Sequence, residues 1–241
     1  MASTLKIIKD SGAIPMITLE PWLFPSKRPV EIDDSTLKEF ATVLKDYNGP
    51  VFLRFAHEMN GNWYPWSGYQ NQKRGSSYIK TWHKVHDVIT KYSGNTKIQW
   101  IWSINAEDVP SEEWNEPKNY YPGDEYVNII GIDGYNFKDR SFGNIFNKQI
   151  KYLRTNFKNK TIFITEISSS SSENNRSKWL KDFFYKFSRK YSDIPLFIWF
   201  DVNKETNWNL NAEQSSIDAF KTGLKTLIPK ESKTLLEEEK I

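Results

Sequence analysis

The chain has 241 residues, with 33 basic and 30 acidic side chains and a formal net charge of +3. Its length suits one α/β barrel domain, and the small, dispersed charge argues against a nucleic-acid partner. No apolar run approaches the roughly 20 residues of a membrane span, and the first residues do not resemble a signal peptide. The chain contains no cysteine, which excludes disulfides, a thiol nucleophile and a thiolate metal site.

Short apolar segments alternate with segments of helical spacing along the whole chain. The apolar segments are continuous runs, which is typical of parallel strands buried on both faces. Between them, apolar residues recur at helical spacing, for example at 36–44, 78–89 and 179–187. This alternation predicts an α/β protein. The six predicted strands span residues 13–19, 51–56, 98–103, 127–133, 161–165 and 195–200.

Polar and aromatic residues collect directly after nearly every predicted strand. Side chains that follow parallel strands converge on one face of a barrel, where TIM barrels build their active sites. A doubly wound sheet would instead gather them at one switch point beside a Gly-rich phosphate turn, and the sequence contains no such turn. We therefore predict an α/β fold of the (β/α)8 TIM-barrel type. The clusters begin at Glu20, His57, Asn105, Gly134, Glu166 and Asp201.

The strand count is short for that fold, because a barrel needs eight βα units and only six strands are recognisable. Residues 4–11 resemble the end of a helix that leads into the first predicted strand. We expect that the first two βα units are missing, that the catalytic barrel spans residues 1–229 and that 230–241 form a charged tail. Either the chain is a shortened version of a longer protein, or the barrel is open and another chain covers its edges, so an oligomer is possible.

One segment, residues 53–66, places a glutamate next to tryptophans at the end of a strand. Its sequence is Leu-Arg-Phe-Ala-His-Glu-Met-Asn-Gly-Asn-Trp-Tyr-Pro-Trp. Glycosidic cleavage needs a carboxylic acid that protonates the leaving oxygen, and flat aromatic faces stack on sugar rings. Glu58 beside Trp63 and Trp66 offers both. A lone glutamate after a strand is more often a surface carboxylate, so this segment needs a second signal.

The second signal is Glu166, which ends an otherwise apolar strand. A charge at that position is costly unless it faces a polar cavity with partners, although a buried structural ion pair would also satisfy it. Two such glutamates on different strands of one parallel sheet favour catalysis. In a retaining mechanism their carboxyl groups stand about 5 to 5.5 Å apart. Arg54 lies in a strand of apolar residues and is expected to face the interior near a carboxylate.

Several of these segments together resemble glycoside hydrolase family 26. In family order they correspond to barrel strands three to seven, residues 198–200 resemble the eighth, and the likeness spans about residues 14 to 208. The resemblance places the family's first two strands before Met1. It implies an endo-acting enzyme that retains anomeric configuration by double displacement, most often on β-1,4-mannan, with β-1,3-1,4-glucan and β-1,3-xylan as variations. It also implies an extracellular or cell-surface protein. The matching segments are 14–22, 53–66, 100–105, 131–136 and 165–166.

The resemblance assigns roles to individual residues. Glu58 would be the acid/base and Glu166 the nucleophile, while Tyr135 would donate a hydrogen bond to Glu166. His57 would orient the substrate or the nucleophile, and Trp199 would form the floor beneath the reacting sugar. Other candidate subsite residues are Glu20, Trp22, Trp63, Trp66, Asn105 and Trp208.

No cofactor and no metal site are expected. His83 and His86 stand three apart on a predicted helix, a spacing that can hold a metal, but no matching third ligand accompanies them. The acidic stretch 107–116 fits a solvated loop better than a calcium site. Two rival functions stay open: a non-catalytic carbohydrate-binding barrel, which would bind polysaccharide without cutting it, and an inverting hydrolase.

Overall fold

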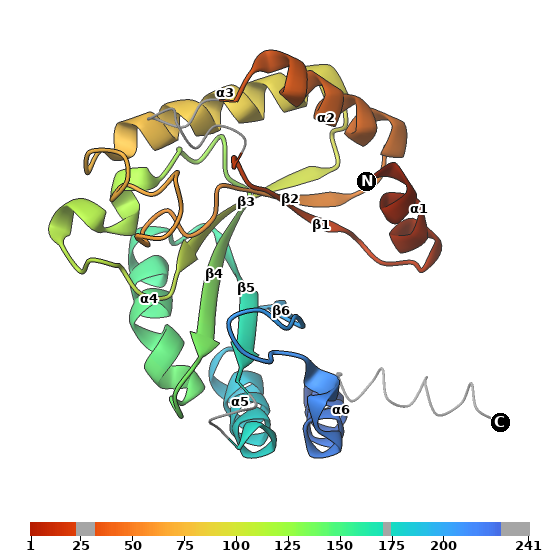
Figure 1. The fold of residues 1–241 in the computed structure, drawn as a ribbon, viewed down its shortest axis with the longest axis vertical. Coiled ribbons are helices and arrows are strands. Elements are labelled where there is room, and N and C mark those ends of the chain that lie inside the picture. The colour runs from red at the N-terminus through yellow and green to blue at the C-terminus, as the bar shows by residue number, and fades with distance from the viewer. Residues whose placement is uncertain (23–31, 171–174, 228–241) are drawn as a thin grey trace. The chain divides into compact units, whose positions relative to one another are not determined.

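The computed structural model describes residues 1–22, 32–170 and 175–227. In this part of the chain six strands alternate with helices (Figure 1) and form one sheet in the order β1-β2-β3-β4-β5-β6. The strands are β1 (Met16–Leu19), β2 (Val51–Phe55), β3 (Ile98–Asn105), β4 (Ile129–Asn136), β5 (Thr161–Ser169) and β6 (Phe197–Trp199). The α-helices are α1 (Ala2–Asp10), α2 (Asp34–Tyr47), α3 (Gly75–Ser93), α4 (Phe142–Asn156), α5 (Arg176–Lys190) and α6 (Gln214–Leu227). Three short 3-10 helices complete the set: η1 (Glu113–Asn115), η2 (Pro117–Tyr120) and η3 (Leu210–Ala212).

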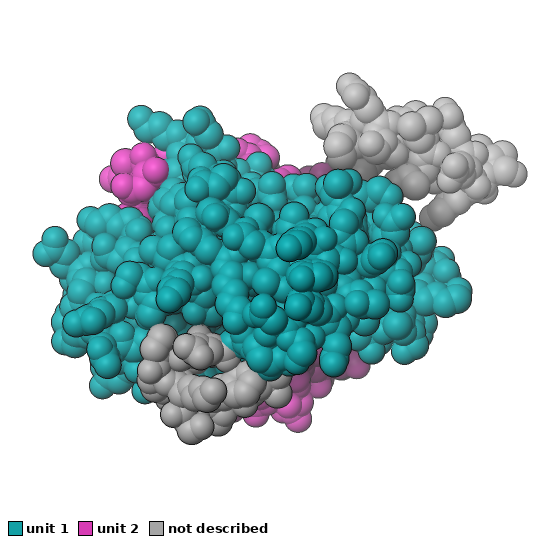
Figure 2. All heavy atoms as spheres, turned by 90° about the horizontal axis from the view of Figure 1, so that it is seen from above, with its two compact units in different colours: residues 1–133, 157–161 teal, residues 134–156, 162–241 magenta. Residues whose placement is uncertain are grey.

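The chain divides into two compact units, coloured separately in Figure 2. The N-terminal unit comprises residues 1–133 and 157–161, and the C-terminal unit comprises residues 134–156 and 162–241. The boundary falls inside β4, between Asp133 and Gly134. Glu58 therefore belongs to the N-terminal unit and Glu166 to the C-terminal unit.

In the N-terminal unit, α2 and α3 alternate along the chain with the parallel strands β1, β2 and β3. The two helices lie side by side (Figure 1). Helix α2 begins where the Asp33 carboxylate accepts a hydrogen bond from the backbone N–H of Thr36 at 2.9 Å, which satisfies a donor that the helix leaves unpaired. Hydrogen bonds from the Ser35 hydroxyl and from the backbone and hydroxyl of Thr36 hold the pKa of the Asp33 carboxyl well below its ordinary value. The inner faces of the two helices bury Leu37, Ala41, Leu44, Trp82, Val85 and Ile89.

In the C-terminal unit, aromatic side chains make up much of the core. Helices α5 and α6 pack against each other, and Gly223 on α6 permits this because a Cβ there would stand 2.0 Å from the Phe184 ring. Phe197 on β6 meets Phe183 and Phe220 edge-on, with ring centroids 5.2 and 6.2 Å away. Burying a ring of this size contributes about 1.5 to 3 kcal/mol, so the rings hold β6 and both helices together.

All six predicted strands are present, with shifted bounds. Strands β3, β4 and β5 continue past their apolar residues and end at Asn105, Asn136 and Ser169. The strand pairing extends into these polar residues, as it does between Asn105 and Asp133. Strand β6 is shorter than predicted: Pro195 lacks a backbone N–H, and the pairing with β5 shifts register between Ile164 and Ile167.

The helix predicted to end near Ser11 is α1. Helices α4 and α6 were not singled out from the sequence. The tail 230–241 lies outside the described residues, and the extent of the single barrel domain, 1–229, stays a prediction. Within the described ranges, the helices fall short of the length and apolar character needed to cross a bilayer.

Candidate active site

Glu58 lies at the carboxyl end of β2 in an unusual backbone conformation. Both Ala56 and Glu58 have positive φ angles, 45° and 54°, a region that non-glycine residues rarely occupy. The backbone N–H of Glu58 donates to the Ser103 carbonyl at 2.9 Å, and its carbonyl accepts from the Gly61 N–H at 3.0 Å. Strained backbone of this kind persists where surrounding structure over-determines it, and it is concentrated at functional sites.

The Glu58 carboxylate is held by two side-chain donors. Asn105 Nδ2 donates to Glu58 Oε1 at 2.7 Å, and Trp63 Nε1 donates to Oε2 at 2.9 Å. The Asn105 amide is itself oriented, because its Oδ1 accepts from the backbone N–H of Glu107 at 2.9 Å. Glu58 is 5% exposed. The carboxyl group thus has one defined direction.

Asn60 is the buried centre of a network beneath this carboxylate. Its Nδ2 donates to the Asn105 carbonyl at 3.0 Å and to Asp108 Oδ1 at 2.9 Å, while its Oδ1 accepts from the Asn105 N–H at 2.8 Å. Its carbonyl accepts from Asn115 Nδ2 at 2.7 Å. The network ties the loop after β2 to the loop after β3. Sequence reasoning missed Asn60, although a polar residue two positions after a strand-end glutamate could have signalled it.

Two tryptophans near Glu58 present open rings. Trp22 is 49% exposed and Trp63 is 44% exposed. Trp22 stands edge-on to Tyr64 and Trp66, with centroids 5.7 and 5.3 Å away, and those two rings stack on each other. Trp66 is buried, and its Nε1 donates to the His57 carbonyl at 2.6 Å. Trp22 and Trp63 therefore form the exposed surface, and Trp66 supports it from below.

His57 is buried and lies among polar partners. Its Nε2 is 3.2 Å from the Tyr64 hydroxyl and 4.0 Å from Glu20 Oε1. Glu20 in turn accepts a hydrogen bond from Trp22 Nε1 at 2.5 Å. The structure thus brings Glu20, Trp22 and His57 together, as the predicted site requires.

Arg54 is paired with a carboxylate, as the sequence predicts. Its guanidinium lies 2.8 Å from Asp133 Oδ1 and 3.0 Å from Thr18 Oγ1, and Ser103 Oγ donates to Asp133 Oδ2 at 2.9 Å. Arg54 is 3% exposed and Asp133 is fully buried. Removal of one partner of such a pair leaves an uncompensated charge, which is strongly destabilising. Asp133 was not singled out from the sequence, where it is the last residue of the predicted strand 127–133.

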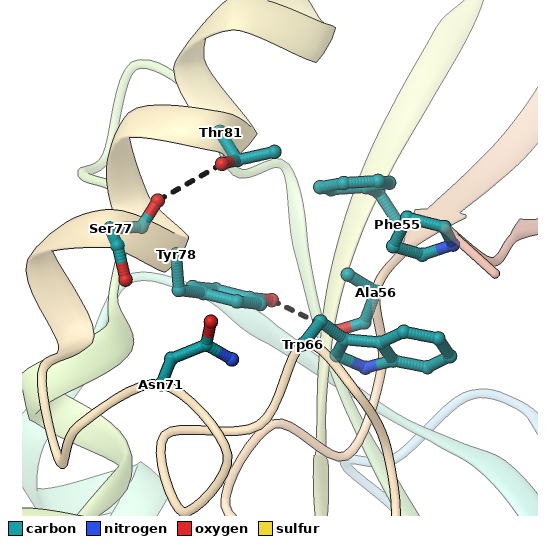
Figure 3. A pocket seen from close by; sticks show the side chains of 8 residues that line it. Phe55, Ala56, Trp66, Asn71, Ser77, Tyr78 and Thr81 are labelled. Carbon is teal, nitrogen blue, oxygen red and sulfur yellow. Dashed lines mark hydrogen bonds between the residues drawn. The ribbon is translucent and has the colours of Figure 1, made fainter. Parts of the chain in front are cut away.

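A small pocket lies on the α3 side of Trp66 (Figure 3). Tyr78 projects from α3 and donates its hydroxyl to the Ala56 carbonyl at 3.1 Å. Burial raises the pKa of this hydroxyl well above its ordinary value, so it remains a donor. Tyr78 therefore braces the strained turn that carries Glu58. The pocket residues are Pro21, Phe55, Ala56, Trp66, Asn71, Ser77, Tyr78 and Thr81.

In the C-terminal unit, Glu166 lies within β5, in the stretch between Ile164 and Ile167 where the pairing with β6 shifts register. The Tyr135 hydroxyl, from the end of β4, donates a hydrogen bond to Glu166 Oε2, which is the contact predicted for this pair. Tyr135 is fixed by aromatic neighbours, with Phe200 and Trp208 centroids 5.4 and 5.3 Å away. The Tyr135 hydroxyl, itself anchored by these rings, thus helps to set the direction of the Glu166 carboxylate.

Trp208 is buried in the aromatic core of the same unit, and Trp199 on β6 is half-buried. Trp199 Nε1 donates to the Trp208 carbonyl at 3.3 Å, and its ring meets Trp179 and Phe220 edge-on. Trp208 is 1% exposed. Trp208 packs directly against Tyr135, and Trp199 is linked to Trp208 through the backbone carbonyl of that residue.

The model of glycosyl hydrolase family 26 matches residues 30–224. The chain belongs to this family. Its Glu58 segment and its Glu166 strand both lie inside the matched range.

Individual relatives agree with the family. Endoglucanase H of Acetivibrio thermocellus is 29% identical over 231 residues, which cover 90% of this chain and 25% of that protein. A mannan endo-1,4-beta-mannosidase of Bacillus subtilis is 34% identical over 48% of this chain and 32% of that protein. This family 26 chain thus spans between a quarter and a third of the length of these relatives.

The fold of the family 26 chain is shared with solved structures. The catalytic domain of the Bacillus sp. JAMB-750 GH26 endo-beta-1,4-mannanase superposes with a TM-score of 0.70 at 17% identity. The superposition covers 94% of this chain and 69% of that one. The predicted fold class, six recognisable strands of a (β/α)8 TIM-barrel type, is confirmed.

The two histidines considered for a metal have protein partners. His83 Nε2 lies 2.6 Å from the Pro122 carbonyl, and its ring stacks on Tyr126 at 3.9 Å. His86 Nδ1 lies 3.0 Å from Asp87 Oδ1. These contacts give both rings a structural role beside η2 and β4.

Proposed function

We propose that this family 26 chain is an endo-acting, retaining glycoside hydrolase that cleaves β-1,4-mannan. The observation that carries the proposal is a pair of glutamates, Glu58 and Glu166, each at the carboxyl end of a parallel strand and each oriented by hydrogen-bond donors. Two carboxyl groups with different surroundings are what double displacement requires.

In the first step, Glu58 donates its proton to the glycosidic oxygen while Glu166 attacks the anomeric carbon. The bond to the leaving sugar breaks, and a glycosyl ester forms on Glu166. In the second step, Glu58 accepts a proton from water, which attacks the same carbon and releases Glu166 as a carboxylate. Tyr135 fits this scheme because a donor on Glu166 stabilises the negative charge that returns there.

The exposed rings of Trp22 and Trp63 suit a polysaccharide, because sugar rings stack on flat aromatic faces. Mannan is supported by the mannosidase relative at 34% identity. A β-linked glucan is the second candidate, since the relative that matches 90% of this chain is named an endoglucanase. A polymer of either kind supports an extracellular or cell-surface location, because the substrate does not cross a membrane.

The proposal is tested by reducing-end release from β-1,4-mannan, mixed-linkage β-glucan and β-1,3-xylan. Parent protein is compared with Glu58→Ala, Glu166→Ala and the control Glu39→Gln, which removes an exposed carboxylate of α2. We expect release by the parent and the control, with losses of about 10⁴-fold or more in both site variants. Binding to a polysaccharide without release by the parent would instead favour a carbohydrate-binding protein.

The two roles are separated with an aryl glycoside that has a good leaving group. Such a substrate needs no acid for the first step, so Glu58→Ala should still release the aryl group in a burst while Glu166→Ala should not. Added azide should accelerate the Glu58→Ala turnover and give a product with retained configuration. An inverted product, detected by NMR of the first anomer formed, would contradict the retaining mechanism.

A further inference from the structure

Phe137 is an exposed aromatic residue that the predicted site does not include. It directly follows Asn136, the last residue of β4, and is 48% exposed. The aromatic side chains around it are far less accessible: Trp208, for example, is 1% exposed. A large apolar ring kept in solvent above a buried cluster is a candidate contact for a ligand.

One residue, Tyr135, connects the Phe137 ring to the Glu166 carboxylate. The Phe137 centroid is 6.1 Å from that of Tyr135, whose hydroxyl donates to Glu166. It is 4.9 Å from that of Trp208, with the two planes at 78°. Phe137, Tyr135 and Trp208 thus form one aromatic wall within the C-terminal unit. The distance of 6.1 Å between the Tyr135 and Phe137 ring centroids is comparable with the size of one sugar ring.

The backbone that carries Phe137 is held by the side chain and carbonyl of Asn136. Asn136 Nδ2 donates to Ser169 Oγ at 3.0 Å, its Oδ1 accepts from the Arg140 N–H at 2.7 Å, and its carbonyl accepts from the Ser170 N–H at 3.0 Å. Asn136 is fully buried. The ring is therefore presented from a fixed point, so little conformational entropy is lost when a ligand stacks on it.

We propose that Phe137 forms a stacking subsite for the sugar that adjoins the one attached to Glu166 during the reaction. This inference rests on the proposed function and adds a subsite residue to it. Exposure alone does not make a subsite: Tyr185 on α5 is 60% exposed, but the Arg189 guanidinium covers its ring at 4.0 Å. Phe137 differs because its ring belongs to the wall that contacts Glu166.

The test measures binding and cleavage separately. Calorimetry in a Glu166→Gln background compares mannose and glucose hexasaccharides with and without Phe137→Ala, Phe137→Trp or the control Tyr185→Ala. Loss of one stacking contact should weaken affinity for the preferred hexasaccharide about tenfold. Phe137→Trp and Tyr185→Ala should bind like the background protein. In the active enzyme, Phe137→Ala should raise KM more than it lowers kcat.

The outcomes distinguish this inference from the proposed function. An active parent whose Phe137→Ala variant keeps the affinity and KM of the parent would overturn the subsite and leave the hydrolase assignment intact. A parent that neither cleaves nor binds any of the polysaccharides would overturn both. Equal thermal melting of the parent and Phe137→Ala, expected for an exposed ring, excludes misfolding as the cause of a loss.

Discussion

The two units hold Glu58 and Glu166, the proposed catalytic pair, by different means. In the N-terminal unit, Glu58 lies on irregular backbone with φ of 54° and is fixed by a buried polar network that includes Asn60 and Asn105. In the C-terminal unit, Glu166 lies within a strand, where the pairing with β6 shifts register, and its partner Tyr135 is fixed by aromatic rings. Polar networks fix direction through hydrogen bonds, whereas aromatic clusters fix it through packing.

This difference fits the two proposed roles. A general acid/base must move a proton, so hydrogen-bond donors and acceptors around it take part in its function. A nucleophile must approach one carbon along one direction, for which a strand is a rigid support. Substitutions in the polar network should therefore alter proton transfer, and substitutions around Glu166 should alter the attack itself.

The largest effect on stability should come from Arg54→Met, which removes the guanidinium that faces the buried Asp133 carboxylate. The expected loss in unfolding free energy is about 3 to 5 kcal/mol, measured by urea denaturation. The matched control is Arg154→Met in the C-terminal unit, whose pair with Asp193 is exposed at 39% and 58%. Such surface pairs contribute less than about 1 kcal/mol. Equal losses in the two variants would show that the buried pair has no special role.

Tyr135→Phe should have the next largest effect, and on catalysis rather than stability. A hydrogen bond to a charged group contributes about 1.5 to 3 kcal/mol, so kcat/KM should fall about 10- to 100-fold. The fall should be similar for aryl glycosides with good and poor leaving groups, because Glu166 attacks in both cases. A loss of kcat/KM confined to substrates with poor leaving groups would mean that Tyr135 supports the acid/base Glu58. That result would contradict the difference drawn between the two units.

Asn105→Ala should show the opposite dependence. Its amide orients Glu58, so cleavage of substrates with poor leaving groups should slow about tenfold, while the first step on activated aryl glycosides should change little. Gln99→Ala, an exposed residue of the same strand, is the control. If Asn105 instead contacts the sugar directly, KM should rise for both classes of substrate.

The smallest effect should come from Asn175→Ala, which removes a helix cap of a kind that both units have. Asn175 caps α5 by accepting from the Lys178 N–H at 2.9 Å, as Asp33 caps α2. Loss of the cap should lower unfolding free energy by about 1 kcal/mol and leave kcat/KM unchanged. A change in kcat/KM would mean that helix stability and the site are coupled, contrary to this account.

The sequence predicts the strands and both glutamates because these depend on local signals. Apolar runs mark the strands, and Glu58 and Glu166 each interrupt such a signal at its carboxyl end. The supporting residues depend on contacts between distant segments: Asp133 pairs with Arg54 across 79 positions, and Asn60 meets Asn105 across 45. The Glu58 backbone, with its positive φ, is likewise held by a distant residue, because its N–H donates to the Ser103 carbonyl. Nothing in the local sequence of Phe137 separates it from a core phenylalanine, so its exposure was not predictable.

The central claim is that Glu166 becomes covalently bonded to the sugar while Glu58 serves it as acid/base. A 2-deoxy-2-fluoro glycosyl fluoride of the preferred sugar traps that ester, because the fluorine at C2 slows both steps while the fluoride leaving group keeps the first step fast. Peptide mass spectrometry should find one label, on Glu166, in the parent and in Glu58→Gln. A label on another residue, or none in an enzyme that the reagent inactivates, would contradict the account.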